Sequence, residues 1–208
     1  MRLRQTSLRE DTREAILDAS NRLLIRYGYK KMTMDDVAHE AGIGKGTIYL
    51  YFRSKEEVAL SCADRRTREI QERLREAANS PAAPAERLHR MLVMRVLTRF
   101  DSVQPFARSL DDLFISLRPA FLARREQWHR AEADIFAEVL VEGAALGALQ
   151  ACDAQAAASA MLTATNALMP FSLSTQELGA RNDVERRATH IADLLLHGVL
   201  RRDGRSGP

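Results

Sequence analysis

The sequence has few of the features that define several large classes of protein. Its two cysteines, Cys62 and Cys152, stand far apart without a C-x-x-C pair, which excludes a disulfide framework and a cysteine zinc site. No run approaches the roughly 18 apolar residues of a membrane span. The charged start at residues 1–5 is not followed by the apolar segment of a secretory signal. We therefore expect a cytoplasmic protein with reduced cysteines and no membrane partner.

Proline and strand signals are also scarce. The first 80 residues contain no proline, and no stretch shows the alternation of apolar and polar residues typical of a strand. A first helix is expected to begin at the Ser7 capping box and to end at Gly28. Apolar spacing, caps, glycines and the later prolines, Pro119 among them, predict helices over residues 8–27, 33–42, 45–51, 54–78, 85–100, 106–117, 120–147, 153–170 and 183–200. The prediction is an all-α fold of about nine helices in two parts.

The charge is unevenly distributed along the chain. Residues 1–55 contain 11 Lys and Arg against 7 Asp and Glu, whereas the other 153 residues contain 20 basic and 21 acidic side chains. The basic excess of this +3 chain therefore lies in its first quarter. Such an asymmetry favours a polyanion-binding module joined to a neutral part, with chance clustering on a solvated surface as the alternative.

The residues between Gly42 and Ser54 carry the strongest functional pattern. Ile48 and Phe52 are four positions apart, so they can anchor a short helix while the other positions face outward. The outward face consists of Lys45, Gly46, Thr47 and Tyr49. Ammonium, hydroxyl and phenol groups donate to phosphates and base edges, and glycine allows a close backbone approach. A short helix of this kind after a glycine turn is typical of a helix-turn-helix, whose second helix enters the DNA major groove.

At this point the sequence resembles the TetR family of bacterial transcriptional repressors. The resemblance is carried by residues 33–58, TMDDVAHEAGIGKGTIYLYFRSKEEV, and most specifically by YLYF at residues 49–52 with SKEE at residues 54–57. It implies a helix-turn-helix DNA-binding domain in residues 1–53 and a helical effector-binding and dimerisation domain in residues 54–208. It also implies a ligand-responsive repressor, not an enzyme and without a cofactor. Such a repressor binds a palindromic double-stranded DNA operator as a homodimer and is released by a small molecule.

The resemblance assigns DNA contacts to seven residues: Thr33, Lys45, Gly46, Thr47, Tyr49, Tyr51 and Lys55. Residues 45–47 would face the base edges, whereas Tyr49 and Lys55 would hold the DNA backbone and Tyr51 would lie at the groove rim. Thr33 would cap the second helix and contact a phosphate. Departures from the family pattern, Gly44 and Leu50, leave the operator sequence open but not the mode of binding.

The last helix is apolar on more than one side, which favours a partner for its second face. The resemblance implies a dimer in which this helix and the small-residue helix over residues 153–170 form a four-helix bundle with their mates. The expected interface residues are Leu162, Met169, Val184, Ala188, Ile191, Leu195 and Gly198. Burial of these residues within one subunit is the alternative.

Proteins of this family usually enclose a small-molecule pocket. Large side chains of the central helices are the candidates for its lining: Met94, Leu97, Phe100, Phe106, Phe114, Trp128, Asn166 and Phe171. Most are expected to be ordinary core residues, and their character favours an apolar or aromatic effector. Arg95 interrupts an apolar run and shares a face with Leu88, Leu92 and Arg99, so we expect it to extend outward into solvent. Pairing of Arg95 with an anion is the alternative.

One pattern favours a different class of protein. Glu86 and His89 form a Glu-x-x-His spacing, as do Glu126 and His129, and paired copies of this spacing bind metal in di-iron enzymes built as helical bundles. Such a site needs a glutamate from each of two further helices, but residues 154–170 contain no acidic side chain. A helical-bundle metal enzyme is therefore the less favoured alternative, and we expect no metal or cofactor.

Overall fold

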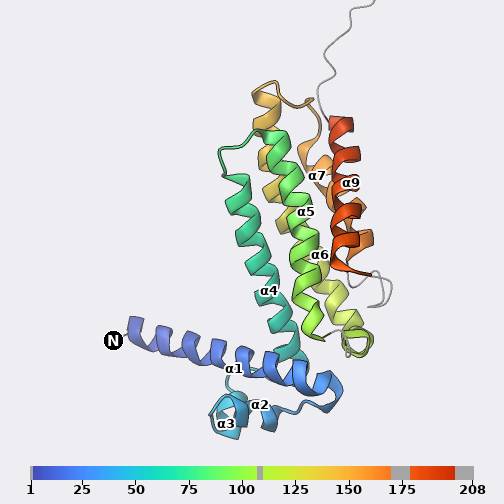
Figure 1. The fold of residues 1–208 in the computed structure, drawn as a ribbon. Helices are drawn as coiled ribbons and strands as arrows, with labels where there is room; N and C mark the ends of the chain where they lie inside the picture. The colour runs from blue at the N-terminus through green and yellow to red at the C-terminus, as the bar shows by residue number, and fades with distance from the viewer. Residues whose placement is uncertain (1, 107–109, 170–178, 200–208) are drawn as a thin grey trace, which may run out of the picture. The chain divides into compact units, whose positions relative to one another are not determined.

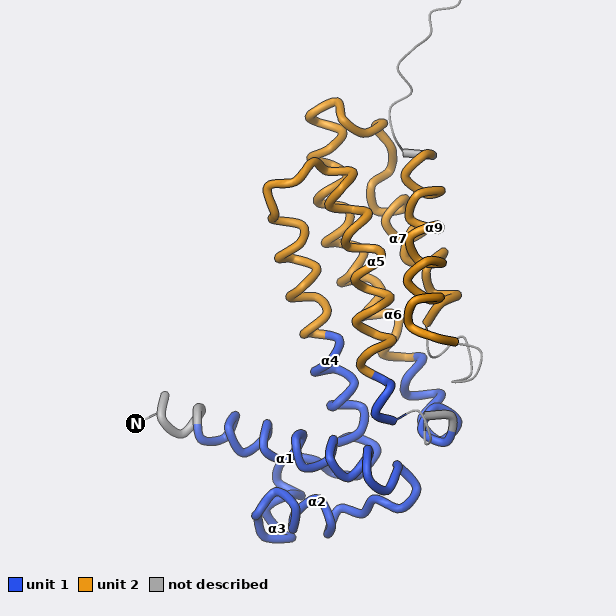
Figure 2. Tube along the Cα trace, in the orientation of Figure 1, with its two compact units in different colours: residues 1–67, 103–122 blue, residues 68–102, 123–208 orange. Residues whose placement is uncertain are grey.

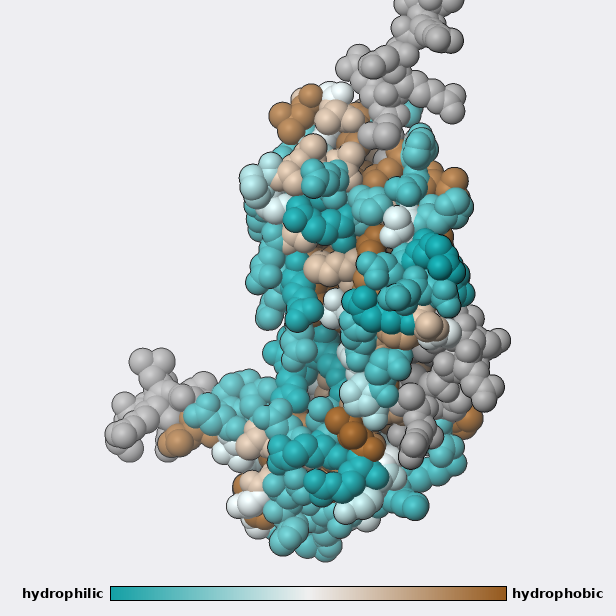
Figure 3. Space-filling view, in the orientation of Figure 1, coloured by the Kyte–Doolittle hydropathy of each residue, from teal (hydrophilic) through white to brown (hydrophobic). Residues whose placement is uncertain are grey.

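The computed structural model describes residues 2–106, 110–169 and 179–199, and within these ranges it contains eight α-helices, two short 3-10 helices and no β-strand (Figure 1). The predicted all-α fold is confirmed. None of the helices in these ranges is long and apolar enough to cross a membrane. On the face drawn in Figure 3, hydrophilic side chains cover most of the surface.

The chain divides into two compact units, coloured separately in Figure 2. Unit 1 comprises residues 1–67 and 103–122, and unit 2 comprises residues 68–102 and 123–208. Three helices contribute residues to both units: α4 (Lys55–Ala78), α6 (Leu110–Ala145) and, by its last residue alone, α5 (Pro84–Val103). The first turns of α4 thus lie in the same compact unit as the N-terminal helices, and a domain division at residues 53 and 54 stays a prediction.

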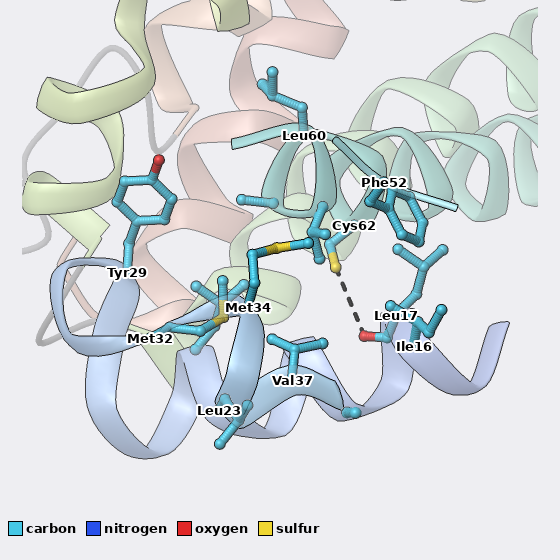
Figure 4. Close-up of a cluster of buried hydrophobic side chains, with 14 of the residues drawn as sticks. Ile16, Leu17, Leu23, Tyr29, Met32, Met34, Val37, Phe52, Leu60 and Cys62 are labelled. Atoms are coloured by element: carbon cyan, nitrogen blue, oxygen red, sulfur yellow. Dashed lines mark hydrogen bonds between the residues drawn. The ribbon is translucent and has the colours of Figure 1, made fainter. Parts of the chain in front are cut away.

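Unit 1 contains α1 (Arg2–Lys31), α2 (Met34–Glu40), α3 (Lys45–Ile48), the 3-10 helix η1 (Gln104–Phe106) and the first parts of α4 and α6. Helix α1 packs against α2, and α2 packs against α3. Their apolar residues share one core, in which Ile16, Leu17, Met32 and Val37 are fully buried (Figure 4). This core fixes the helix that precedes the glycine turn and the helix that follows it.

Cys62 belongs to the same core. Its Sγ donates a weak hydrogen bond to the carbonyl oxygen of Leu17 at 3.6 Å, drawn as a dashed line in Figure 4. Burial raises the pKa of the Cys62 thiol to about 11, so the thiol stays protonated at neutral pH. The residue packs as a small apolar side chain without thiolate chemistry.

Unit 2 contains most of α5 (Pro84–Val103), the remainder of α4 and α6, α7 (Ala154–Thr165), the 3-10 helix η2 (Asn166–Leu168) and α9 (Arg181–Val199). Leu74, Leu88, Met91 and Phe136 are fully buried in one apolar cluster. A second cluster is built on residues of α5, η2 and α9: Val96, Leu97, Phe100, Leu168, Met169, Val184 and Ala188.

Helix α6 departs most from the sequence prediction. The sequence predicts a break at Pro119, but this proline lies inside the 36-residue helix. Proline removes one backbone donor and crowds the preceding turn. Leu117 is buried in the unit 1 core, and Ala120 and Phe121 pack against it. Tertiary packing on both sides of the proline thus outweighs the local preference.

Two other helices also have different bounds from those predicted. Helix α1 begins at Arg2, ahead of the Ser7 capping box, and continues past Gly28 to Lys31. Gly28 takes the left-handed conformation, with φ 76°, and separates two helical segments within these bounds, so the first segment ends there as predicted. Helix α3 ends at Ile48, so the predicted helix over residues 45–51 is shorter than expected.

Candidate functional site

The helix-turn-helix is built from α2, a glycine turn and α3. Thr33 caps α2, because its Oγ1 accepts from the backbone N–H of Asp36 and its own N–H donates to Asp36 Oδ2, both at 3.1 Å. Gly42 adopts φ 68°, the left-handed conformation that glycine allows. The backbone N–H of Ile43 donates back to the carbonyl oxygen of Ala38 at 2.9 Å. The predicted capping box and glycine turn are confirmed.

Helix α3 presents a short exposed face above a buried anchor. Ile48 is fully buried and Phe52 nearly so, and both hold the segment on the unit 1 core. The residues on the outer side are Lys45, Gly46 and Tyr49, which are exposed, and Thr47, which is half-buried. A Cβ added at Gly46 would meet no atom within 4 Å, so the backbone there is open to a close approach from outside.

The start of α3 lacks a side-chain cap. Gly44 is the N-cap residue, and no side chain accepts a hydrogen bond from the first turn. An uncapped helix start leaves backbone N–H groups for solvent or for a ligand such as a phosphate. The departure from the family pattern at this position therefore has a local structural consequence.

Lys45 is held by an ion pair between α3 and α2. Its Nζ donates to Asp35 Oδ2 at 2.7 Å, and this hydrogen bond, followed by the charge of Asp35, raises the pKa of Lys45. The two side chains are 69% and 56% exposed. Exposed ion pairs contribute little stability, so this ammonium can pass to a phosphate or a base acceptor at small cost. Asp35 was not apparent from the sequence, because its pairing depends on the geometry of the turn.

Lys55 holds the end of α1. Its Nζ donates to the carbonyl oxygens of Tyr29 at 3.3 Å, Lys30 at 3.4 Å and Met32 at 3.3 Å, and it lies 4.7 Å from the centre of the Tyr29 ring. A cation at the C-terminal end of a helix is favoured by the unpaired carbonyl groups there. The side chain is half-buried, and its contact with the DNA backbone stays a prediction.

All seven predicted DNA-contact residues lie in unit 1, between the cap of α2 and the first turn of α4. Tyr49 is 48% exposed and follows α3 directly. Tyr51 is half-buried and packs against the unit 1 core, so part of its ring serves the fold. The structure thus gathers the seven residues on one short segment, and their roles toward DNA stay predictions.

The predicted effector-pocket residues do not line one cavity. Phe106 and Phe114 lie in unit 1. Phe106 is buried in the core there, with the guanidinium of Arg66 4.1 Å from the centre of its ring. The Phe114 ring meets Phe121 edge to face, with 5.2 Å between the ring centres. Both contacts are ordinary packing.

The other candidates lie in unit 2, except Phe171, which lies outside the described residues. Met94 and Leu97 line an open groove of about 500 Å³, together with charged residues of α4, α5 and α9. Trp128 and Asn166 line a different and much smaller cavity. Phe100 is buried in the apolar cluster around Val96. The large side chains chosen from the sequence therefore belong to several environments.

The structure contradicts the predicted outward direction of the Arg95 side chain. It is 2% exposed instead of extending into solvent. Its Nε donates to Glu132 Oε2, and its two terminal nitrogens donate to Thr165 Oγ1 and Asn166 Oδ1 at 3.1 Å. The expected outward direction was wrong for two reasons: the leucines that share its face are fully buried, and α6 supplies a countercharge that the sequence of α5 does not reveal.

Glu132 accepts from two arginines. Arg99 Nη2 donates to Oε1, while Arg95 occupies Oε2. Burial alone would raise the pKa of Glu132, but the charges of Arg95 and Arg99 outweigh burial and hold the pKa below its ordinary value. The carboxylate is therefore ionised inside the helical bundle.

Four predicted dimer residues fill the interior of a single chain. Leu162, Met169, Val184 and Ala188 have no exposed surface, because they pack in the two apolar clusters of unit 2. Ile191 and Leu195 are half-buried. The side-chain surroundings of Gly198 lie outside the described residues. Any partner would therefore meet other side chains of these helices.

The residues of the metal alternative are engaged elsewhere. His89 Nε2 lies 3.2 Å from Asp193 Oδ1, and His129 Nε2 lies 2.9 Å from Ser159 Oγ. Glu126 pairs with Arg130 on the surface of α6. Within the described ranges, no group of three or more His, Cys, Asp or Glu side chains is placed to hold a metal ion. The two Glu-x-x-His pairs, Glu86 with His89 and Glu126 with His129, are therefore not assembled into a metal site in the described residues.

Known proteins similar to this chain are transcriptional regulators. The family model for bacterial regulatory proteins of the tetR family matches residues 16–62. An uncharacterized HTH-type transcriptional regulator of Bacillus subtilis, YhgD, is 37% identical over 82 residues, which are 39% of this chain and 43% of that protein. The regulator EthR of Mycolicibacterium smegmatis is 28% identical over 195 residues, which are 92% of this chain and 88% of that protein.

The fold is similar as well. A crystal structure of a TetR/AcrR-family transcriptional regulator of Thermobifida fusca superposes with a TM-score of 0.69 at 28% identity, covering 92% of this chain and 100% of that chain. The chain spans about two fifths of the Bacillus relative, whereas it spans nearly the whole of EthR. The similarity extends beyond the helix-turn-helix, and the proteins that share it are regulators, not enzymes. Residues 16–62 thus match the tetR family of bacterial regulatory proteins, and most of the chain is similar to a transcriptional regulator of the TetR/AcrR family.

Proposed function

We propose that the chain is a ligand-responsive repressor that binds a palindromic DNA operator as a homodimer in the cytoplasm and is released by a small molecule. The observation that carries DNA binding is the exposed start of α3. Its backbone is open at Gly46, and its lysine is held only by an exposed ion pair. Both features suit insertion into a major groove, where close backbone approach and exchangeable donors are needed.

In this proposal, residues 45–47 read base edges. Thr47 supplies a hydroxyl that donates or accepts, and Lys45 leaves Asp35 to donate to an acceptor in the groove. Thr33, Tyr49, Tyr51 and Lys55 hold the DNA backbone on either side. Phosphate contacts fix the register of the protein on the duplex, and base contacts select the sequence.

The homodimer is proposed to use the outward faces of α7 and α9. Apart from Gln155, the exposed positions of α7 and its continuation are small, since Ala156, Ala160, Thr163 and Ala167 recur at helical spacing. On α9, Leu194 is 62% exposed. Small residues allow close helix approach, and a large exposed leucine gains from burial. These side chains replace the fully buried ones that the sequence suggested.

An effector bound in unit 2 is proposed to act through α4, which contributes to both units. A ligand that favours one orientation of α4 would change the separation of the two α3 helices in a dimer. The coupling must be reciprocal, so operator DNA should weaken effector binding by the same factor. Equal effector affinity with and without operator would contradict this mechanism.

Selection from a random DNA duplex pool at two salt concentrations tests the DNA-binding part. We expect a palindrome among the retained sequences and a steep loss of affinity with salt, because released counterions drive phosphate binding. Thr47→Ala should change the preferred sequence. Glu126→Ala, on the surface of α6 in unit 2, is the matched control and should leave the preference unchanged. A folded, dimeric protein that retains no preferred sequence would overturn the proposal.

A further inference from the structure

Two arginines and one glutamate meet among the described residues inside unit 2. Arg95 and Arg99 both donate to Glu132, and each of its two carboxylate oxygens is used by one arginine. The remaining partners of Arg95, Thr165 and Asn166, are neutral. Arg95, Arg99 and Glu132, called here the arginine cluster, therefore comprise two cations and one anion.

Among the described residues, no second carboxylate lines the cavity beside the arginine cluster. The adjoining cavity is lined by Arg95, Arg99, Arg125, Trp128, His129, Glu132 and Asn166, so among the described residues Glu132 is its one carboxylate. Burial, followed by the charge of Arg95, lowers the pKa of His129, which is therefore neutral at neutral pH. The charge of Arg125 acts in the same direction on Arg95 and His129. The described residues that line the cavity thus carry three formal positive charges, from Arg95, Arg99 and Arg125, and one negative charge, from Glu132.

A donor beside the cavity also lacks an acceptor. The Nε of Arg99 is buried, and no hydrogen-bond partner for it is present in the described part of the chain. A buried N–H of a cation without an acceptor is costly, and such groups are normally satisfied by protein, water or a ligand. Arg99 lines the cavity and is 12% exposed, so its guanidinium lies at the edge of the bundle interior.

We propose that this cavity binds the carboxylate group of a small organic acid, which is the effector of the repressor. The excess positive charge of the cluster favours an anion, and the planar guanidinium group of arginine suits the planar carboxylate. The cavity is small, about 10 Å³, and opens to solvent, so the carboxylate would bind at its mouth and leave its apolar remainder outside.

The role of the bound acid as an effector rests on the proposed function, whereas the binding site itself does not. It also replaces the apolar effector favoured by the sequence with an acid whose tail alone is apolar. The incoming carboxylate would accept from Arg99 and compete with Glu132 for it. Because Arg95 joins α5 to α6 and to Thr165 of α7, such a change at the cluster alters a contact shared by three helices.

Tryptophan emission of the full-length protein tests the site, because Trp128 is the single tryptophan of the chain and lines the cavity. The probes are acetate and cyclohexanecarboxylate, each compared with its neutral amide at constant chloride concentration. We expect a saturable change in emission with the carboxylates and at least about tenfold weaker binding of the amides, since a charge-assisted pair is lost.

The variant Arg99→Gln should weaken carboxylate binding by about tenfold, and Arg99→Lys should restore part of it. Arg90→Gln, which changes an exposed arginine of α5 outside this cavity, should leave the affinity unchanged. The comparison of acid with amide in the unchanged protein does not depend on how the variants fold. Amides that bind as well as acids, chloride that produces the same saturation, or no saturable response to either acid would each overturn the proposal.

The two proposals fail in different ways. The emission titration needs no DNA, so a protein that retains no operator can still support the carboxylate site. Carboxylates that bind but leave operator affinity unchanged would support the site and contradict the proposed effector coupling. Release of the operator by the amides alone would support a ligand-responsive repressor and overturn the carboxylate assignment.

Discussion

The two compact units use charge in opposite ways. In unit 1 the core is apolar and the ion pairs lie on its surface, as Lys45 with Asp35 and Arg22 with Glu40 show. In unit 2 an arginine pair and Glu132 lie inside the helical bundle, and Glu132 has no exposed surface. Exposed pairs are exchanged easily with solvent or a polyanion, whereas buried pairs are fixed by the cost of separating them.

This difference indicates where each unit is adaptable. A surface that must bind DNA benefits from donors that are released at little cost, and Lys45 is such a donor. A buried cluster with an excess cation has one arrangement in the free chain and a second one when an anion enters. The comparison therefore predicts small stability effects at the α3 surface and large ones at the arginine cluster.

The largest expected effect is at Glu132. Glu132→Ala leaves two arginines in the bundle without their countercharge, and we expect the free energy of unfolding to fall by about 3–5 kcal/mol. Urea denaturation followed by the emission of Trp128 measures it. Glu126→Ala, which removes an exposed pair on the same helix, should have no measurable effect. Similar losses of unfolding free energy in the two variants would contradict the proposed difference between buried and exposed charge.

The ionised state of Glu132 also makes the stability of the fold depend on pH in the acid range. Its pKa is held below the ordinary 4.5 in the folded chain, so the unfolded chain binds a proton more readily. Its contribution to stability is therefore fully present above about pH 4.5 and is lost as the pH falls through the folded-state pKa. The variant Glu132→Gln should lose this part of the acid dependence. An unchanged slope of stability against pH below 4.5 would contradict the assignment.

Substitution of Lys55 is expected to have an intermediate effect on stability and a separate effect on the salt dependence of DNA binding. Lys55→Met removes the ammonium from three carbonyl oxygens at the end of α1, which should lower the free energy of unfolding by about 1–3 kcal/mol. If the same ammonium also contacts a phosphate, the slope of log affinity against log salt should fall by about one. Lys31→Met, at the exposed end of α1, is the control for charge alone. A stability loss with an unchanged salt slope would restrict Lys55 to its structural role.

Substitution of Gly46 is expected to lower operator affinity without lowering the stability of the fold. Gly46→Ala adds a methyl group that meets no atom of the chain within 4 Å, so stability should stay constant or rise by up to about 1 kcal/mol. Operator affinity should fall by about tenfold, because the methyl group occupies the space of the approaching DNA. Thermal unfolding and a DNA-binding titration measure the two effects. Unchanged affinity would show that DNA does not approach the backbone at this position.

Gly44 gives the smallest expected effect. Gly44→Ser supplies the missing hydroxyl cap of α3 and should raise the free energy of unfolding by a few tenths of a kcal/mol, roughly the difference between serine and glycine at this position. Gly44→Ala, which lacks the hydroxyl, should not stabilise the chain. Equal gains in the two variants would mean that backbone entropy, not the cap, limits the stability of this turn.

The sequence was most informative where local chemistry determines structure. Thr33 with Asp36 and the glycine turn at Gly42 depend on residues within a few positions, and the structure reproduces both. Pro119 shows the opposite case, because its helix continues through packing contacts of Leu117 and Phe121 that no local rule contains. Arg95 was misread for the same reason, since its partner lies 37 positions away on another helix.

The sequence by itself determined the all-α class, the helix-turn-helix and the family resemblance. Caps, glycine turns and apolar spacing act over one or two helical turns, and their energy does not depend on the rest of the chain. The tertiary structure alone decided that Lys45 pairs with Asp35, that Lys55 holds the end of α1 and that Arg95 lies inside unit 2. Each of these depends on which charged group another helix brings within a few ångströms, and the energy of a charge is set by its burial and its nearest partners.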